Sequence, residues 1–323
     1  MNENTENCAV SILIAQLNKY IYTRYDMLGF ACICKSLTEN GCFKSTTVKY
    51  ISKLSREEQL KKLRAIAVDN LYNTYKILEW CKTNNIFMYR MSSDLIPLAT
   101  YFKEWEWWND PDILKQCSNI KAAAHDNSIR LSMHPDQFCV LNSHKQEVVA
   151  SSVEILEYHN RLSNLTGNKL LVLHAGSSAD GKRKASERFI HNFLKLDEDI
   201  RSKLALENDD KIYNAADILS ICEKLGIPMV LDLHHHRCNN NGEDLYSLRT
   251  RIIKTWNGNR PKLHLSTGKE FRTDRRHADF ISEEDYKLAL DFAGSDFDIM
   301  LECKEKDIAL LKLRSLKASD YSQ

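Results

Sequence analysis

The sequence predicts a single (β/α)8 barrel of the TIM type, and three observations support this prediction. The chain has 323 residues, of which 43% are hydrophobic, which is enough for one large core. Eight short apolar, β-rich segments alternate with segments of helical periodicity. The apolar segments show no polar alternation, as is typical of parallel strands buried on both faces. We therefore expect a closed barrel and not an open doubly wound sheet.

The expected strands follow one another at intervals that suit βα units. They are Met27–Ile33, Ile86–Met91, Ile129–His134, Leu170–His174, Lys203–Glu207, Pro228–Asp232, Pro261–Leu265 and Phe297–Glu302. Between them, Ser55 with Glu58 three residues later predicts a capping box that starts a long helix. Helices are expected over Arg56–Thr83, Glu147–Leu165, Asp217–Leu225 and from Ser282 onward.

The chain is expected to form one domain with short extensions. Residues 1–25 are assigned to an N-terminal extension with an extra helix at Ile12–Tyr20, residues 26–316 to the barrel and residues 317–323 to a C-terminal tail. No apolar run approaches the ~18 residues that a membrane span needs, and the polar N-terminus does not resemble a signal peptide. Ten cysteines without paired spacing are typical of reduced thiols. The sequence thus predicts a monomeric intracellular protein of the cytoplasm or nucleoid/nucleus, not secreted and not bound to a membrane.

The charge of the chain does not by itself indicate a nucleic-acid partner, because the formal net charge is only +1. Basic residues nevertheless gather at Lys182-Arg183-Lys184, at Arg237 and over Lys269–Arg276. We expect all three clusters in loops. They are interpreted either as solvated loops or as contacts to phosphate groups.

Six consecutive expected strands carry a potential metal ligand at their C-terminal ends. These residues are His134, His174, Glu207, Asp232, His264 and Glu302. In a barrel the C-terminal ends of the strands meet in one mouth, where the active sites of this fold lie. A ring of carboxylates there would repel unless cations neutralised it. The sequence therefore predicts a metal cluster in the mouth of the barrel.

The number of candidate ligands indicates more than one ion. His235 and His236 follow Asp232, and His277 follows the seventh strand. A tetrahedral catalytic Zn²⁺ takes only three protein ligands, so this set favours two or three metals. Mixed histidine and carboxylate ligation suits Mn²⁺, Fe²⁺ or Zn²⁺. Clustered metals commonly hydrolyse phosphodiesters.

The chain resembles the UV damage endonucleases from about Leu28 to Leu313. The matching motifs are L-G-F at 28–30, Y-R-M-S-S-D-L-I-P-L-A-T at 89–100, L-S-M-H-P-D-Q-F at 131–138, V-L-H-A-G at 172–176, L-A-L-E-N-D-D at 204–210, D-L-H-H at 232–235, P-K-L-H-L-S at 261–266, R-H-A-D at 276–279 and M-L-E-C-K-E-K-D at 300–307. The resemblance implies a barrel similar to that of endonuclease IV. It also implies cleavage of double-stranded DNA immediately 5′ to cyclobutane pyrimidine dimers and 6-4 photoproducts, which leaves a 3′-hydroxyl without ATP.

The resemblance further implies roles for the metal ligands. Glu207 is expected to bridge two metals and to be essential for catalysis. His134 and His174 complete one site, while a second is formed by Asp232, His264 and Glu302. A third site is expected from His235 and His277. The implied cofactors are two or three divalent cations, with Mn²⁺ favoured over Zn²⁺, Mg²⁺ or Fe²⁺.

Other residues are expected to act beside the metals. Lys262 matches a lysine that can be carboxylated near the metals and is taken as catalytic; the alternative is a strand lysine whose stem covers the barrel wall. Gln137 and Phe138 match a pair that fills the gap left by a flipped-out lesion. Phe30 and Arg90 are expected to contact the DNA in the same groove.

Three alternative functions stay open. A sugar isomerase or epimerase on the same barrel also uses histidine and carboxylate ligands. It would normally need fewer ligands and a closed pocket for a small substrate. An endonuclease IV type of enzyme would act on abasic sites, and a protein that binds damage without cleaving it would keep the groove but lose the chemistry. The intact set of ligands argues against this last alternative. No obligatory protein partner is evident.

Overall fold

The computed structural model of the chain describes residues 27–136 and 138–320. The expected helix at Ile12–Tyr20 and Gln137 lie outside the described residues. Within those residues, none of the helices combines the length and the apolar content that crossing a membrane requires. All nine cysteines of this part of the chain are free thiols, as the sequence predicts.

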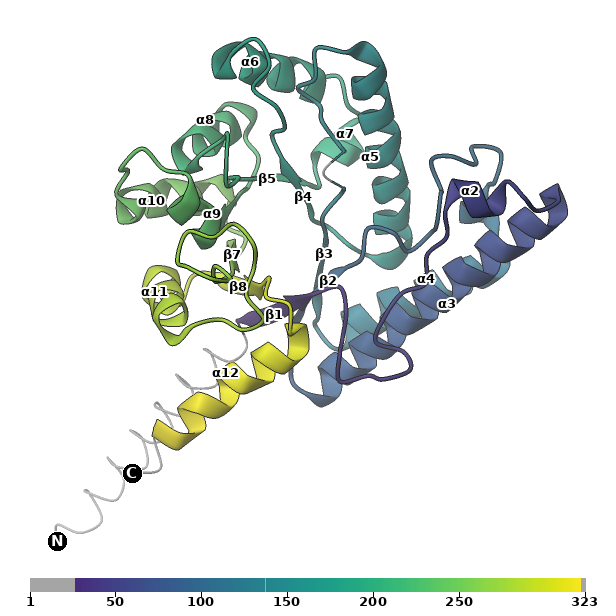
Figure 1. Ribbon diagram of the computed structural model, residues 1–323, viewed down its shortest axis with the longest axis horizontal. Helices are drawn as coiled ribbons and strands as arrows, with labels where there is room; N and C mark the ends of the chain where they lie inside the picture. The colour runs from purple at the N-terminus through teal and green to yellow at the C-terminus, as the bar shows by residue number, and fades with distance from the viewer. Residues whose placement is uncertain (1–26, 137, 321–323) are drawn as a thin grey trace, which may run out of the picture.

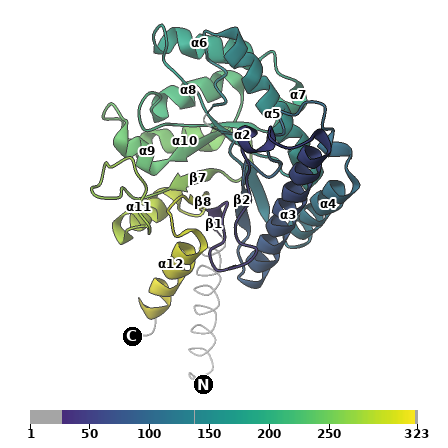
Figure 2. The same cartoon turned by 45° about the vertical axis from the view of Figure 1, so that its right-hand side comes forward.

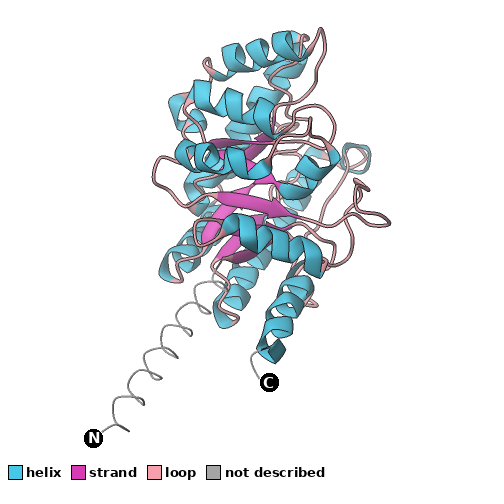
Figure 3. Ribbon diagram, turned by 90° about the vertical axis from the view of Figure 1, so that its left-hand side faces the viewer, coloured by secondary structure: helices cyan, strands magenta, loops and turns pink. Residues whose placement is uncertain are grey.

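Eight parallel strands close into a barrel in the order β1 to β8, which confirms the predicted fold. They are β1 (Leu28–Ala31), β2 (Met88–Met91), β3 (Arg130–Met133), β4 (Leu171–His174), β5 (Leu204–Glu207), β6 (Met229–Asp232), β7 (Lys262–Leu265) and β8 (Asp298–Leu301). Figure 1 shows the strands at the centre with helices around them, and Figure 3 shows the strands running side by side through the molecule.

The helices cover the outside of the barrel. They are α2 (Val48–Ile51), α3 (Arg56–Thr83), the 3-10 turn η1 (Trp107–Asn109), α4 (Pro111–Asp126), α5 (Gln146–Thr166), α6 (Lys182–Phe193), α7 (Glu198–Arg201), α8 (Ala215–Leu225), α9 (Leu233–Cys238), α10 (Leu245–Thr255), α11 (Glu283–Ala293) and α12 (Lys306–Asp320). The last helix packs beside β1, as Figure 2 shows. It continues past residue 316, where the expected barrel domain ends.

Local signals in the sequence set the helix boundaries. Helix α3 spans the expected residues, and its capping box joins Ser55 and Glu58 as predicted. Helix α8 starts two residues earlier than expected because Asn214 forms a capping box with Asp217. The helix ends at Gly226, whose left-handed φ of 67° favours glycine.

The strands have a hydrophobic core on their outer face and smaller clusters inside the barrel. Leu171 and Leu173 belong to the main core beneath the helices, whereas the alternate residue Val172 packs in a separate buried cluster with Ala205 and Val230. Successive side chains of a strand point to opposite faces. The separate cluster therefore fills the barrel interior, and the residues that end each strand on this inner face reach the mouth.

Two of the three basic clusters lie in helices and not in loops, so their expected placement is wrong. Lys182 to Lys184 form the first turn of α6, and Arg237 lies in α9. Cations are unfavourable near a helix N-terminus. In the structure Lys182 Nζ lies 2.7 Å from a carboxylate oxygen of Asp217, which offsets this cost.

Candidate metal centre

The six ligands expected at strand ends all lie at the C-terminal mouth of the barrel. His174, Glu207 and Asp232 are the last residues of β4, β5 and β6. The other three differ by one position: His134 and Glu302 directly follow β3 and β8, and His264 is the penultimate residue of β7. A shift of one residue would normally turn a side chain to the other face of a strand. These side chains stay on the inner side because register differs from strand to strand.

Glu207 lies at the centre of the cluster, where its side chain is 1% exposed. Its Oε2 is 3.1 Å from His134 Nε2 and 3.8 Å from His174 Nε2. Its Oε1 is 2.8 Å from His264 Nδ1. Both oxygens of this carboxylate therefore face imidazole nitrogens from opposite sides, which is the arrangement that a bridging ligand needs.

The ligands form three groups, and each group includes Glu207. The groups are His134 with His174, Asp232 with His235, and His264 with Glu302. In each group the ligand atoms lie within 4.8 Å of one another. The resemblance implied that Asp232 shares a site with His264 and Glu302. The structure instead brings Asp232 together with His235, because α9 starts directly after β6 and its first turn folds back over the strand end.

Burial and charge together set the protonation of this cluster. Burial alone would raise the pKa of Glu207, but the nearby His264 and His174 outweigh it and hold that pKa well below its usual range. Burial opposes the charged form of His264, yet Glu207 and Glu302 raise its pKa to about 9. The pKa of His235 is also raised to about 9, against burial, by Asp232 and Glu207. The Glu207 carboxylate thus favours its ionised form and attracts positive charge.

The histidines are oriented as metal ligands usually are. Nδ1 of His134 lies 3.0 Å from the carbonyl oxygen of Pro135, and Nδ1 of His235 lies 2.9 Å from that of Asn208. Because a carbonyl oxygen can only accept, Nδ1 carries the hydrogen in both residues. Nε2 is then the ring nitrogen that a cation could occupy in place of a proton, and a partner on the other ring nitrogen is typical of histidines that bind metals.

Unpaired polar atoms in the cluster also fit a cation. Oδ2 of Asp232 is buried and has no hydrogen-bond partner within the described chain, although the residue is 0% exposed. Nε2 of His264 is likewise buried without a partner in that part of the chain. Buried polar groups are normally paired, and unpaired ones require an explanation. Coordination to a cation would satisfy both atoms.

Asn208 contacts the candidate ligands and was not singled out in the sequence. Its side chain is fully buried, and its amide donates to the Asp232 carbonyl at 3.0 Å and accepts from the Asp232 backbone N–H at 2.9 Å. Its own carbonyl fixes His235. Asn208 therefore joins the ends of β5 and β6 and orients two candidate ligands. In the sequence, the feature that could have indicated this role is an amide side chain directly after Glu207.

Arg90 lies inside the cluster and not on an open DNA-binding surface. Its guanidinium donates to Oε1 of Glu302, which also lies 3.0 Å from His264 Nδ1. The side chains of Arg90 and Glu302 are 13% and 12% exposed. Arg90 thus holds a candidate metal ligand in place, and its expected contact to DNA stays a prediction.

Lys262 lies below the mouth, inside the barrel, where it is 0% exposed. Its Nζ donates to Ser132 Oγ at 2.7 Å. Burial and the nearby Arg130 lower the pKa of Lys262 well below its usual value. Both causes disfavour the charged form of the amine. Ser132 was not singled out in the sequence, since a serine within a strand is most often only a packing residue.

The two aromatic residues expected near the DNA lie in different environments. Phe138 is 68% exposed on the loop that follows β3, beyond His134. Phe30 is 0% exposed and packs edge-on against Trp80 of α3 at 5.9 Å between ring centroids. The expectation that Phe30 lines the groove is wrong. Its neighbour Ala31 faces the barrel interior, and strand alternation turns Phe30 outward toward the helices.

The remaining expected histidines lie around the cluster. The ring of His277 is 6.4 Å from that of His235, and its Nδ1 donates to the carbonyl of Glu302 at 2.7 Å. His277 thus borders the Asp232 and His235 group without belonging to it. His236 points elsewhere, because the helical turn of α9 directs it away from its neighbour His235.

Comparisons with known proteins show what the chain is similar to. The family described as UV-endonuclease UvdE matches residues 26–323. A UV DNA damage endonuclease of Bacillus cereus (strain B4264) is 34% identical over 293 residues, which cover 88% of this chain and 92% of that protein. The corresponding protein of Bacillus mycoides (strain KBAB4) is 35% identical over 293 residues, with the same coverage of both chains.

Solved structures share the fold. The crystal structure of SacUVDE is 35% identical, with a TM-score of 0.81, and covers 92% of this chain and 99% of that one. Endonuclease IV from Thermus thermophilus is 16% identical with a TM-score of 0.56, over 76% of this chain and 94% of that one. At that identity the likeness extends to the fold alone.

Proposed function

The chain belongs to the UV-endonuclease UvdE family, and we propose that it cleaves DNA immediately 5′ to UV photoproducts, leaving a 3′-hydroxyl. The photoproducts are cyclobutane pyrimidine dimers and 6-4 photoproducts. One observation carries this proposal: six other histidine and carboxylate ligands converge on Glu207 in the mouth of the barrel. A cluster of this size exceeds what the epimerase alternative needs.

The residues would divide the chemistry as follows. Glu207 links all three groups of ligands, with His134 and His174 on one side and His264 with Glu302 on the other. Asp232, His235 and the neighbouring His277 offer a further position. Divalent cations bound here, Mn²⁺ being favoured, would activate water and stabilise the leaving oxygen. Asn208 and Arg90 hold the ligands in place, and Phe138 stands at the rim where a duplex would rest.

Lys262 is proposed to be carboxylated. A neutral, buried amine is the form that adds carbon dioxide, with release of one proton. The resulting negative charge would be favoured by Arg130 and Arg90, the two cations that now disfavour a charged Lys262 amine. Native mass spectrometry should then show a gain of one carbon dioxide in the wild type and none in Lys262→Met. An unchanged mass in the wild type under carbon dioxide would leave Lys262 as a structural residue.

Nicking of supercoiled plasmid tests the proposal directly. UV-irradiated plasmid should be converted to open circles with Mn²⁺ present, whereas EDTA should stop the reaction and unirradiated plasmid should stay supercoiled. A duplex with a single abasic site provides the second substrate. Cleavage of that duplex without cleavage of irradiated plasmid would replace the proposal by the endonuclease IV type of activity.

A further inference from the structure

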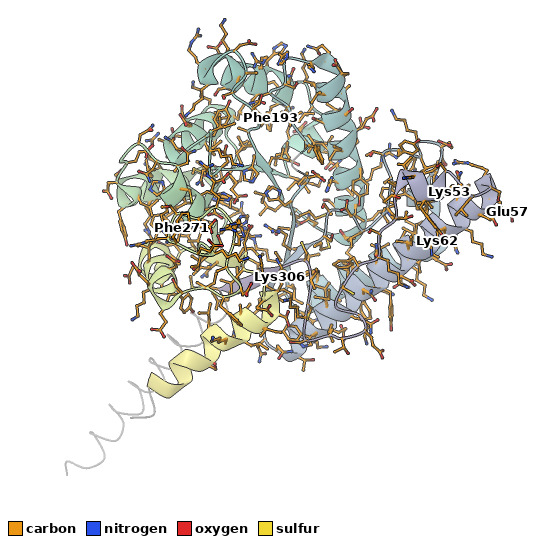
Figure 4. The ribbon with its side chains drawn as sticks, in the orientation of Figure 1. Lys53, Glu57, Lys62, Phe193, Phe271 and Lys306 are labelled. Carbon is orange, nitrogen blue, oxygen red and sulfur yellow. The ribbon has the colours of Figure 1, made fainter. Side chains whose placement is uncertain are left out.

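A short rigid loop beside the metal centre carries an exposed aromatic residue with no role in the proposed site. This loop, residues 268–277, connects β7 to α11 and is called here the β7 finger. Its two ends pair as antiparallel segments, with a bridge between Gly268 and His277 and a hydrogen bond of 2.8 Å from Lys269 N–H to the Arg276 carbonyl. Phe271 lies at its tip and is 61% exposed; Figure 4 labels it beside α9 and α11.

Asp274 fixes the shape of the β7 finger from within. Its carboxylate accepts from the backbone N–H of Arg276 at 3.0 Å and from that of Glu270 at 3.2 Å, and from the Arg276 guanidinium at 2.7 Å. The Asp274 N–H donates to the Phe271 carbonyl at 2.9 Å. A side chain at Gly268 would collide with that same carbonyl, since an added Cβ would lie 2.2 Å from it. The tip is therefore held in a defined conformation.

The base of the β7 finger is joined to the metal centre. His234 Nε2 donates to the Asp274 carbonyl at 2.9 Å, and Cys238 donates to the Thr273 carbonyl. Both donors lie in α9, the helix that also carries His235. His277 ends the finger and borders the same ligand group. The position of Phe271 is thus fixed relative to the candidate ligands.

The position of Phe271 is opposite to that of Phe138. The two residues lie on the loops that follow β7 and β3, and these strands are four apart in either direction around the closed eight-stranded barrel. Each loop also carries or follows a candidate ligand, His277 or His134. A duplex laid across the mouth would therefore meet an exposed aromatic side chain on each side of the metal centre.

We propose that Phe271 is a second DNA-contacting residue, which packs against the duplex flanking the lesion on the side away from Phe138. An aromatic ring on a prebuilt loop contributes apolar contact at low conformational-entropy cost. Lys269 beside it is exposed and has no ion-pair partner among the described residues, so it can reach a phosphate. This inference rests on the proposed function, since it takes double-stranded DNA as the substrate.

The two aromatic residues should differ in what they recognise. Phe138 is expected to read the lesion, whereas Phe271 contacts undamaged flanking duplex. Phe271→Ala should therefore weaken binding to damaged and undamaged duplexes alike, by about tenfold, within the range for loss of one aromatic contact to DNA. Phe271→Tyr should retain most of the affinity. Tyr72→Ala, which removes a 42% exposed aromatic on α3, is the matched control and should bind as the wild type does.

Fluorescence anisotropy can test this with duplexes that carry a non-cleavable methylphosphonate at the expected cleavage position. Two further duplexes are each shortened on one side of the lesion. The loss of affinity caused by Phe271→Ala should vanish with one of them and persist with the other. Metal content and melting temperature of the variant should equal those of the wild type. Equal affinity of Phe271→Ala and wild type for the long duplex would overturn the inference, as would a loss of affinity that accompanies a loss of metal.

The outcomes separate this inference from the proposed function. If the wild type does not nick irradiated plasmid, the proposed function fails whatever the binding data show. If the wild type nicks the plasmid and Phe271→Ala binds every duplex as the wild type does, only the role of Phe271 fails.

Discussion

The guanidinium of Arg90 donates a hydrogen bond to the carboxylate of Glu302 at the mouth of the barrel. Both side chains are largely buried, so the positive charge of Arg90 compensates a carboxylate that is only slightly exposed to water. Burial alone would raise the pKa of Glu302, but Arg90 and His264 hold it well below its usual range. A bound cation would supply the same compensation. Arg90 and metal should therefore substitute for each other in stabilising Glu302.

Arg90→Met should accordingly destabilise the metal-free protein more than the metal-loaded protein. Breaking a buried ion pair costs on the order of 3 kcal/mol, and Mn²⁺ should reduce that cost. Urea denaturation gives the difference in the free energy of unfolding between wild type and Arg90→Met, once with EDTA and once with Mn²⁺. Arg64→Met, at a more exposed ion pair, is the control. A loss of stability that is the same with and without metal would contradict the compensation argument.

Glu207→Gln should remove metal-dependent nicking while the protein stays folded. The amide keeps the shape of the side chain but loses the charge shared by three groups of ligands. Residues that only orient metal ligands contribute about 10–100-fold, so loss of the shared ligand should cost more than about 100-fold. The measurement is initial nicking rate together with metal content. Near wild-type rates with unchanged metal content would show that the cluster is not the catalytic centre.

Truncating Gln137 and Phe138 to alanine should separate recognition from chemistry. The double variant should lose roughly ten- to hundredfold in affinity for dimer-containing duplex, because stacking on an aromatic contributes ~1–3 kcal/mol. Affinity for undamaged duplex depends on phosphate contacts and should change little. Titration of both duplexes tests this, with metal content as the control. Equal losses on both duplexes would mean that the pair supports the loop instead of reading damage.

The salt dependence of DNA binding should reflect which basic side chains of the β7 finger are not already paired with a carboxylate. Arg276 is committed to Asp274 and Glu270, and Arg272 to Glu284, whereas Lys269 has no ion-pair partner in the described chain. Removing one phosphate contact lowers the slope of log affinity against log salt by about 1. Lys269→Met should show this change, and Lys195→Met, in the exposed turn between α6 and α7, should not. A binding constant that is flat with salt in the wild type would favour a small-molecule substrate.

His159 should make the protein sensitive to acid. It is 2% exposed, and burial lowers its pKa to about 4 from an ordinary value of 6.5. A lowered histidine pKa in the folded state means that the unfolded chain binds the proton more tightly. The contribution of neutral His159 to the free energy of unfolding is therefore fully present above pH 6.5 and is lost as the pH falls toward 4. The contribution is about 3 kcal/mol.

Replacement of His159 by glutamine should flatten that pH dependence. Urea midpoints at pH 7 and pH 4, both with EDTA, give the comparison between variant and wild type. His125→Gln removes a histidine whose side chain is 88% exposed and should leave the dependence unchanged. An identical loss of stability in wild type and His159→Gln would show that other groups dominate acid unfolding.

The barrel and the position of the candidate ligands could be predicted because both follow from local patterns. Strand segments are short and apolar, and a strand-end residue must lie in the mouth whatever the details of packing. The partner of each ligand was harder to predict. Asp232 joins His235 because α9 begins without a linker after β6, and the sequence does not reveal so tight a turn.

The other differences also arise from how neighbouring elements pack, which local sequence patterns do not reveal. Phe30 was expected in the groove because it ends a strand motif, but one residue of alternation places it under α3. Arg90 was expected to contact DNA, and the sequence did not reveal its contact with Glu302, which depends on the fold. Asn208 escaped notice because its role depends on the neighbouring strand.

The central place of Glu207 has a consequence for stoichiometry. Its carboxylate has two oxygens, while three groups of ligands include it. No more than two ions can each take their own oxygen from it, and a third must depend on the ligands around Asp232. We expect two tightly held ions and one that exchanges freely. Dialysed enzyme would then retain two equivalents, and the concentration of free divalent ion in its surroundings would set the occupancy of the third.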